Sequence, residues 1–111
     1  MKHCKETFTI GRFRTTEHID STKNPAEMPS TAECVERYSK ATYLDTANNV
    51  SVNYSRNVNG QVVWSRTDIS GRTRRIKNKV ASNLVKIYTT YGGDDILFQG
   101  ITEDRKEVEN G

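Results

Sequence analysis

The sequence is poor in hydrophobic residues. Only 33% of its 111 residues are hydrophobic, 28% are charged, and the mean hydropathy is -0.79. This composition excludes a thick core packed on both sides, while five Tyr, three Phe and one Trp argue against full disorder. The chain lacks a run of about 18 apolar residues, so no membrane span is expected. We therefore predict one small domain over residues 1–111, built on a single modest core.

Cysteine is scarce as well. Cys4 and Cys34 allow at most one disulfide, and the count is equally compatible with two free thiols. Neither belongs to a Cys-x-x-Cys pair, and His3 and His18 do not supply a metal-ligand spacing, so we predict no metal site and no cofactor. No Ser or Cys is paired with a recognisable base and orienting group, which predicts that the chain is not an enzyme.

Alternating β-branched and aromatic residues are what the chain does contain. Short runs of this kind lie at residues 50–54, 61–69 and 84–88. Polar turns at 45–49 and 57–60 lie before and after the first run. Such runs, broken by Asn-rich and Gly-containing turns, are typical of an antiparallel meander. The fold class predicted is all-β, an antiparallel up-and-down meander.

The flanking segments extend this prediction. Residues 8–19 are expected to form a first strand with a bend at Gly11, and residues 35–44 a second strand. Between them, residues 20–31 contain both prolines and predict an exposed loop that could act as a lid. A short apolar run at 96–98 precedes a charged tail at 101–111.

Residues 76–91 are ambiguous. Ile76, Val80, Leu84, Ile87 and Tyr91 fall at helical spacing, and Gly92 would suit a helix C-terminus. Residues 84–90 are nevertheless rich in β-formers and alternate as a strand does. We favour the strand.

A basic stretch at residues 72–79 contains much of the net charge of +3. Such a stretch can bind phosphates or a membrane surface, although it is more often a solvated loop or edge. No aromatic side chains are interleaved with it, so no nucleic-acid partner is predicted. Asn49 and Asn53 each begin a glycosylation triplet, and Asn49 lies at a predicted turn.

The order of these motifs resembles that of the lipocalins, in the apolipoprotein-D-like and bilin-binding branch. Gly11-Arg-Phe13 resembles the family's Gly-x-Trp, Cys34-Val-Glu-Arg-Tyr38 its entry to strand B, and Val50-Ser-Val-Asn-Tyr54 its strand C. The segments 69–73 and 83–88 resemble the elements that follow strand D and form strand E. The family's later strands and its downstream cysteines have no counterpart, so the resemblance implies either a truncated chain or a shortened variant with an open or self-patched barrel. Its exposed strand edges would favour a homodimer.

This resemblance implies a secreted, non-enzymatic carrier of a small hydrophobic ligand such as a pigment, retinoid, sterol or lipid. Inward-facing side chains would line the pocket, with the tyrosine hydroxyls as polar contacts. The expected ligand-binding residues are Tyr38, Val50, Val52, Tyr54, Trp64, Val85 and Ile87. The alternative is an interaction protein that binds a protein or polyanion partner through a sheet edge or the basic stretch 72–79.

Overall fold

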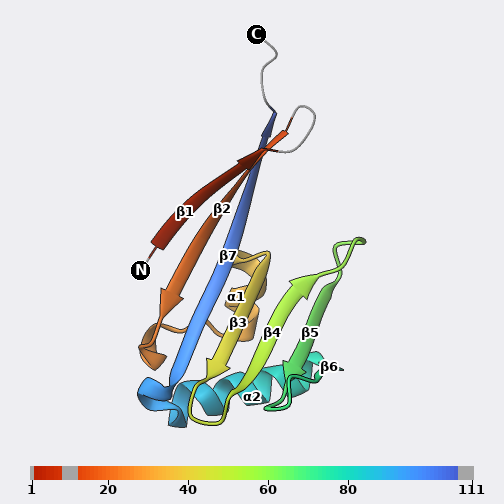
Figure 1. Ribbon diagram of the computed structural model, residues 1–111. Helices are drawn as coiled ribbons and strands as arrows, with labels where there is room; N and C mark the ends of the chain where they lie inside the picture. The colour runs from red at the N-terminus through yellow and green to blue at the C-terminus, as the bar shows by residue number, and fades with distance from the viewer. Residues whose placement is uncertain (1, 9–12, 108–111) are drawn as a thin grey trace.

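The computed structural model describes residues 2–8 and 13–107, with side chains for 18–24 and 26–103. Seven strands form one antiparallel sheet in the order β1-β2-β7-β3-β4-β5-β6, and two helices cover one of its faces (Figure 1). The strands are β1 (Lys2–Phe8), β2 (Phe13–Thr22), β3 (Lys40–Asp45), β4 (Val50–Arg56), β5 (Val62–Thr67), β6 (Thr73–Ile76) and β7 (Ile96–Glu107). The helices are α1 (Thr31–Arg37) and α2 (Asn78–Tyr91), and two short 3-10 turns are η1 (Pro25–Glu27) and η2 (Gly93–Asp95).

The predicted antiparallel sheet is confirmed, and its strand order differs from that of a simple meander. Strands β3 to β6 follow one another as expected, and the turn between β4 and β5 is closed by Gly60 with a φ of 78°. Strand β7 then lies between β2 and β3, so the sheet is not up-and-down throughout. Strands β1 and β6 stand at its two ends, which leaves the sheet open. A lipocalin barrel is not confirmed.

The strand predicted over residues 35–44 starts before the observed strand β3, because residues 31–37 form helix α1. Ser30 is the N-cap: its Oγ accepts a hydrogen bond from the Glu33 N–H at 3.3 Å and donates one to the Glu33 carboxylate, also at 3.3 Å. The Ser30 side chain thus satisfies the Glu33 amide, which would otherwise lack a partner at the helix start, and the Glu33 carboxylate in turn holds the Ser30 hydroxyl. The chain is extended from Tyr38, the C-cap of α1, and β3 begins at Lys40.

The strand predicted within residues 76–91 is wrong, because these residues form β6 only at their start and then helix α2. Ala81, Val85 and Tyr88 are the buried residues of α2, at spacings of four and three. That periodicity places all three side chains on one helical face, which packs on the sheet beside β4 and β5. The N–H of Gly92 bonds to the Tyr88 carbonyl and ends the helix, as the sequence suggested.

Strand β2, near the start of the chain, pairs with β7, near its end. The single strand predicted over residues 8–19 is instead parts of β1 and β2, which pair antiparallel, and the predicted bend at Gly11 lies outside the described residues. Residues 101–107, expected in a charged tail, belong to β7 and pair with β2 from Phe13↔Glu107 to Thr22↔Phe98. Figure 1 shows β1, β2 and β7 extending beyond the part of the sheet that the helices cover.

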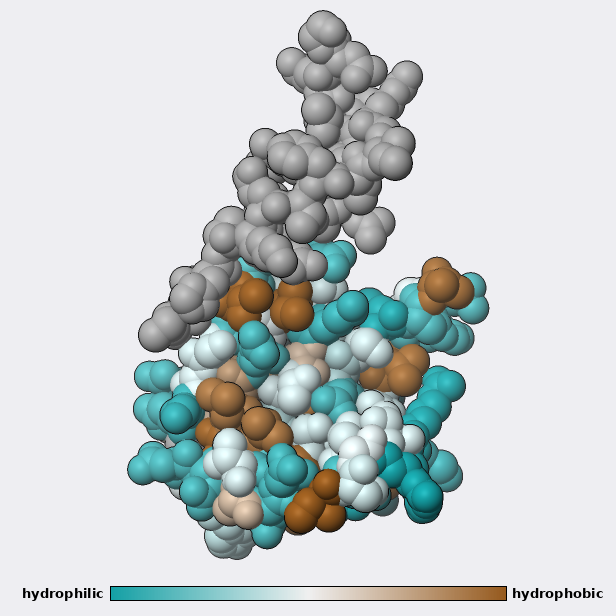
Figure 2. Space-filling view, viewed as in Figure 1, coloured by the Kyte–Doolittle hydropathy of each residue, from teal (hydrophilic) through white to brown (hydrophobic). Residues whose placement is uncertain are grey.

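Among the side chains that the structure describes, the buried hydrophobic core lies on the helix-covered face. Cross-strand neighbours such as Tyr43, Val52 and Phe98 are buried there. The opposite face carries a row of polar contacts across four strands, from Thr42 through Asn53 and Thr67 to Thr73, at 3.2, 3.1 and 2.9 Å. Figure 2, in the same view as Figure 1, shows hydrophobic residues scattered among hydrophilic ones. A one-sided core accounts for the low hydrophobic content of the sequence.

Candidate functional site

Most of the predicted pocket residues lie in the core between the sheet and the helices. Tyr38, Val52, Tyr54, Trp64 and Val85 are buried, with Trp64 only 2% exposed. Val50 is half-buried at the start of β4, and Ile87 points outward from α2 with 52% of its surface exposed. The structure therefore brings five of the seven together, within a packed cluster, and leaves Ile87 apart from it.

Ring-to-ring packing fills the space that a ligand would need. The rings of Tyr54 and Trp64 lie 5.2 Å apart between centroids, and Phe98 packs against Tyr43 at 4.9 Å and Tyr38 at 5.4 Å. Tilted contacts at these distances are favourable aromatic pairs. These side chains act as core residues in this structure.

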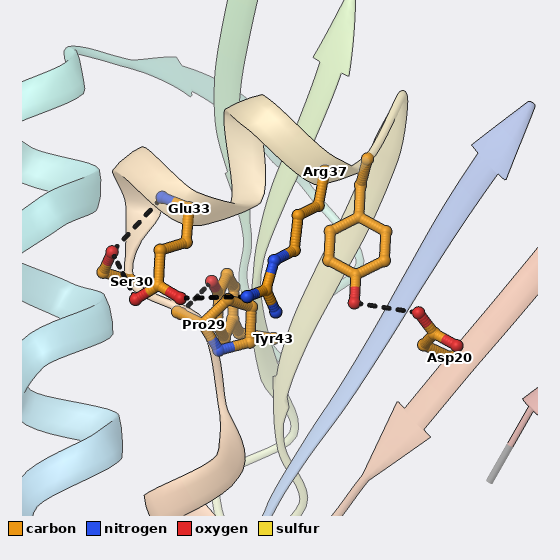
Figure 3. A network of polar contacts seen from close by, with 7 residues as sticks. Asp20, Pro29, Ser30, Glu33, Arg37 and Tyr43 are labelled. Carbon is orange, nitrogen blue, oxygen red and sulfur yellow. Dashed lines mark hydrogen bonds and ion pairs between the residues drawn. The ribbon is translucent and has the colours of Figure 1, made fainter.

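Tyrosine hydroxyls fix α1 and the preceding loop against the sheet (Figure 3). The Tyr43 hydroxyl donates to the Pro29 carbonyl at 2.6 Å, and the Tyr38 hydroxyl donates to Asp20 on β2 at 3.0 Å. Pro29 and its neighbour Met28 are buried, so this part of the predicted lid is an anchored segment. A buried hydroxyl with a partner avoids the cost of an unsatisfied polar group.

Cys34 lies fully buried on α1 beside Tyr43, as a free thiol, so the possible Cys4–Cys34 disulfide is not formed. Burial raises the pKa of the Cys34 thiol from 9.0 to about 12, while its hydrogen bond with Tyr43 acts in the opposite direction. Burial also raises the pKa of Tyr38 to about 12, with the Asp20 carboxylate adding to the rise. At neutral pH the Cys34 thiol is therefore protonated and a poor nucleophile.

We expect Cys34 to resist alkylation in the folded protein. In a Cys4→Ser background at pH 8, iodoacetamide should label Cys34 only after denaturation in urea, as followed by mass spectrometry. The pKa of the Cys34 thiol is higher in the folded protein than in the unfolded chain. Its contribution to the free energy of unfolding is therefore fully present below about pH 9 and is lost as the pH rises toward 12. Rapid labelling of the native protein would contradict the buried position.

A basic groove lies where β5, β6 and the start of α2 meet. Its volume is about 580 Å³. The half-buried side chains of Val62 and Ile76 contribute an apolar floor. The residues lining it are Val62, Trp64, Arg75, Ile76, Lys77, Asn78 and Lys79. The basic stretch 72–79 thus provides most of its wall.

The cations of this groove are available to a ligand. Arg75, Lys77 and Lys79 are exposed, and in the described part of the chain none of them forms an ion pair with a carboxylate. Lys77 is also the N-cap of α2, and its side chain provides no capping acceptor for the first amides of the helix. The helix dipole adds positive potential at the same end. The groove can therefore hold a negatively charged group.

The sequence located the basic stretch, but it did not reveal the groove. Val62 and Trp64 are ten or more residues away from Lys77 in the chain and join it only because Trp64 pairs with Ile76 across β5 and β6. The alternation of residues 61–69 was the one signal that could have placed Val62 and Trp64 on a common face.

The described residues provide neither a metal centre nor a membrane-spanning helix. Among them no group of three His, Cys, Asp or Glu side chains is close enough to hold a metal ion. None of the helices in that part of the chain is long and apolar enough to span a bilayer. In comparisons with known proteins, no family model, no curated protein and no solved structure matches this chain.

Proposed function

We propose that the protein is a non-enzymatic interaction protein that binds an acidic, extended protein segment along β6 and the basic groove. The observation that carries this proposal is the position of the basic stretch. β6 stands at the end of the sheet, pairs only with β5, and joins directly to the start of α2 at the groove. An edge strand presents backbone N–H and C=O groups that a further strand can use.

The side chains beside β6 favour an acidic peptide over other polyanions. Arg72, Arg74 and Arg75 would meet carboxylates along such a strand, while Val62 and Ile76 offer an apolar floor to one of its side chains. A single-stranded nucleic acid would require aromatic faces on which bases stack, and Trp64 is buried. A short, highly charged edge also discourages pairing with neutral strands, which gives the site selectivity.

Fluorescence anisotropy with a labelled ten-residue peptide of alternating Glu and Val tests the proposal. We expect saturable binding that weakens as salt rises, because the charges at this edge are exposed to solvent. The double variant Arg75→Glu/Lys77→Glu should bind at least about tenfold more weakly, equivalent to about 1.4 kcal/mol. The matched control Lys23→Glu/Lys40→Glu reverses two exposed charges elsewhere and should bind as the unaltered protein does.

Two further ligands separate the sources of affinity. The same peptide with N-methyl groups on alternate residues cannot complete the strand pairing, so we expect it to bind more weakly than the parent peptide. Equal binding of both peptides, or of both charge variants, would contradict the proposed site. Tighter binding of a single-stranded oligonucleotide than of the peptide would also overturn it, in favour of a nucleic-acid ligand.

Three expectations stay predictions: the carrier function implied by the lipocalin resemblance, the secretion of the protein, and the glycosylation of Asn49. A barrel that holds a small hydrophobic ligand would require the open sheet to close and the packed aromatic side chains to separate. Saturable quenching of Trp64 fluorescence by a retinoid or a fatty acid would support the carrier function.

A further inference from the structure

Helix α2 carries a second apolar face that its own sheet does not cover. Val80, Leu84, Ile87 and Tyr91 follow one another at spacings of four, three and four residues, so they form one stripe along the helix. Val80 is 44% exposed, Ile87 52% and Tyr91 82%, while Leu84 is partly buried against the core. We refer to these four residues as the α2 stripe.

The α2 stripe is separate from the face that the helix uses in its own fold. Ala81, Val85 and Tyr88 contact the core and account for the packing of α2 on the sheet. The other large hydrophobic side chains exposed in the described residues, Val58 and Ile69, lie singly in the turns after β4 and β5. Isolated exposed hydrophobic residues are common, but an aligned set on one helix indicates a contact surface.

The charges around α2 fit a second copy of the same helix in antiparallel orientation. α2 contains no acidic residue, and Asn83 and Thr90, which border the stripe, are uncharged. Lys77 lies at the start of the helix, and Asp94 and Asp95 follow its end. If Val80 of one helix packs against Tyr91 of the other, and Leu84 against Ile87, Lys77 comes near Asp94 of the partner subunit. A two-fold axis makes this contact twice, whereas parallel helices would bring Lys77 beside its own copy.

We propose that the protein forms a homodimer in which the α2 stripes of two copies pack antiparallel across a two-fold axis. Spacings of four and three apolar residues suit helix-to-helix packing of this kind. The apolar contact is made by side chains of α2 and not by the backbone of β6, so this dimer differs from one formed through strand edges. Ile87 and Tyr91 do not line the basic groove, so the stripe does not depend on the proposed function, whereas Lys77 belongs both to the groove and to the proposed ion pair.

Sedimentation velocity over a range of protein concentrations tests the dimer. We expect a monomer–dimer equilibrium for the unaltered protein and at least about a tenfold rise in the dissociation constant for Ile87→Glu, because a buried anchor contributes most of the energy of an interface. The matched control Ile69→Glu introduces the same charge at an exposed turn and should dimerise normally. Far-UV circular dichroism establishes that both variants are folded.

A charge exchange tests the antiparallel orientation. Asp94→Lys and Lys77→Asp should each weaken the dimer, and the double variant that combines them should recover it, at least in part. A monomer at every concentration, or a dimer unchanged by Ile87→Glu, would overturn the proposal. Failure of the double variant to recover would overturn the antiparallel arrangement. The Ile87→Glu variant should still bind the acidic peptide, so a loss of dimerisation is distinguishable from a loss of the β6 site.

Discussion

Replacement of Trp64 by alanine should lower the free energy of unfolding by about 3–5 kcal/mol, as expected for truncation of a buried Trp. Trp64 is 2% exposed, packs against the Tyr54 ring and pairs with Ile76 across the sheet. Removing the indole leaves a cavity that neighbouring strands cannot fill without bending, and it also removes part of the groove floor. A small domain has a total stability of about 5–15 kcal/mol, so much of it would be lost.

Urea denaturation followed by far-UV circular dichroism measures this effect without relying on the tryptophan signal. Protein concentration must be held constant, since any dimer would couple stability to concentration. The control Val58→Ala removes an exposed side chain and should change stability by less than about 0.5 kcal/mol. A loss below about 1 kcal/mol for Trp64→Ala would contradict burial of the indole in a packed core.

Substitution of Gly100 by alanine should destabilise the protein by about 1–3 kcal/mol, because the added methyl group overpacks the core. Gly100 lies in the interior of β7 opposite Ala41, and a Cβ built there would be 2.6 Å from the Tyr38 ring and 2.9 Å from the Phe98 ring. Glycine in a strand interior commonly marks such a close approach. The Tyr38 ring therefore occupies the space that a side chain at residue 100 would fill.

A double-mutant cycle with Tyr38→Ala tests whether this contact is the cause. In the Tyr38→Ala background the added methyl group meets less resistance, so Gly100→Ala should cost clearly less there than in the unaltered protein. Urea midpoints of the four proteins give the coupling free energy. Strict additivity would indicate that the cost arises from the backbone of β7 instead of the Tyr38 ring.

Local patterns predicted the elements whose stability is local. The run 50–54 and the turn at 57–60 became β4 and its hairpin, because alternation and an Asn-Gly turn need only neighbouring residues. Ser30 followed three residues later by Glu33 is a helix-start pattern that the prediction did not use, and the strand was predicted from the β-formers in residues 35–44 alone. In α2 the helical spacing was visible, and burial of Ala81, Val85 and Tyr88 prevailed over the β-propensity of its residues.

The candidate sites were accessible from sequence only in part. The basic stretch was recognised from its composition. Its place at the end of the sheet could not be predicted, because the strand order depends on pairing between segments far apart in the chain. β2 and β7 pair through residues as distant as Phe13 and Glu107. No local signal specifies such a partner.

The sequence by itself determined that the protein has a single, one-sided core, a set of aromatic and β-branched residues to fill it, and a basic segment at 72–79. The tertiary structure alone decided that this aromatic set packs against two helices, that β7 inserts between β2 and β3, and that the basic segment meets Val62 and Trp64 in a groove. The physical reason is that composition and periodicity report what each residue favours locally. Burial of a shared apolar face, and the hydrogen bonds between distant strands, select which faces come together.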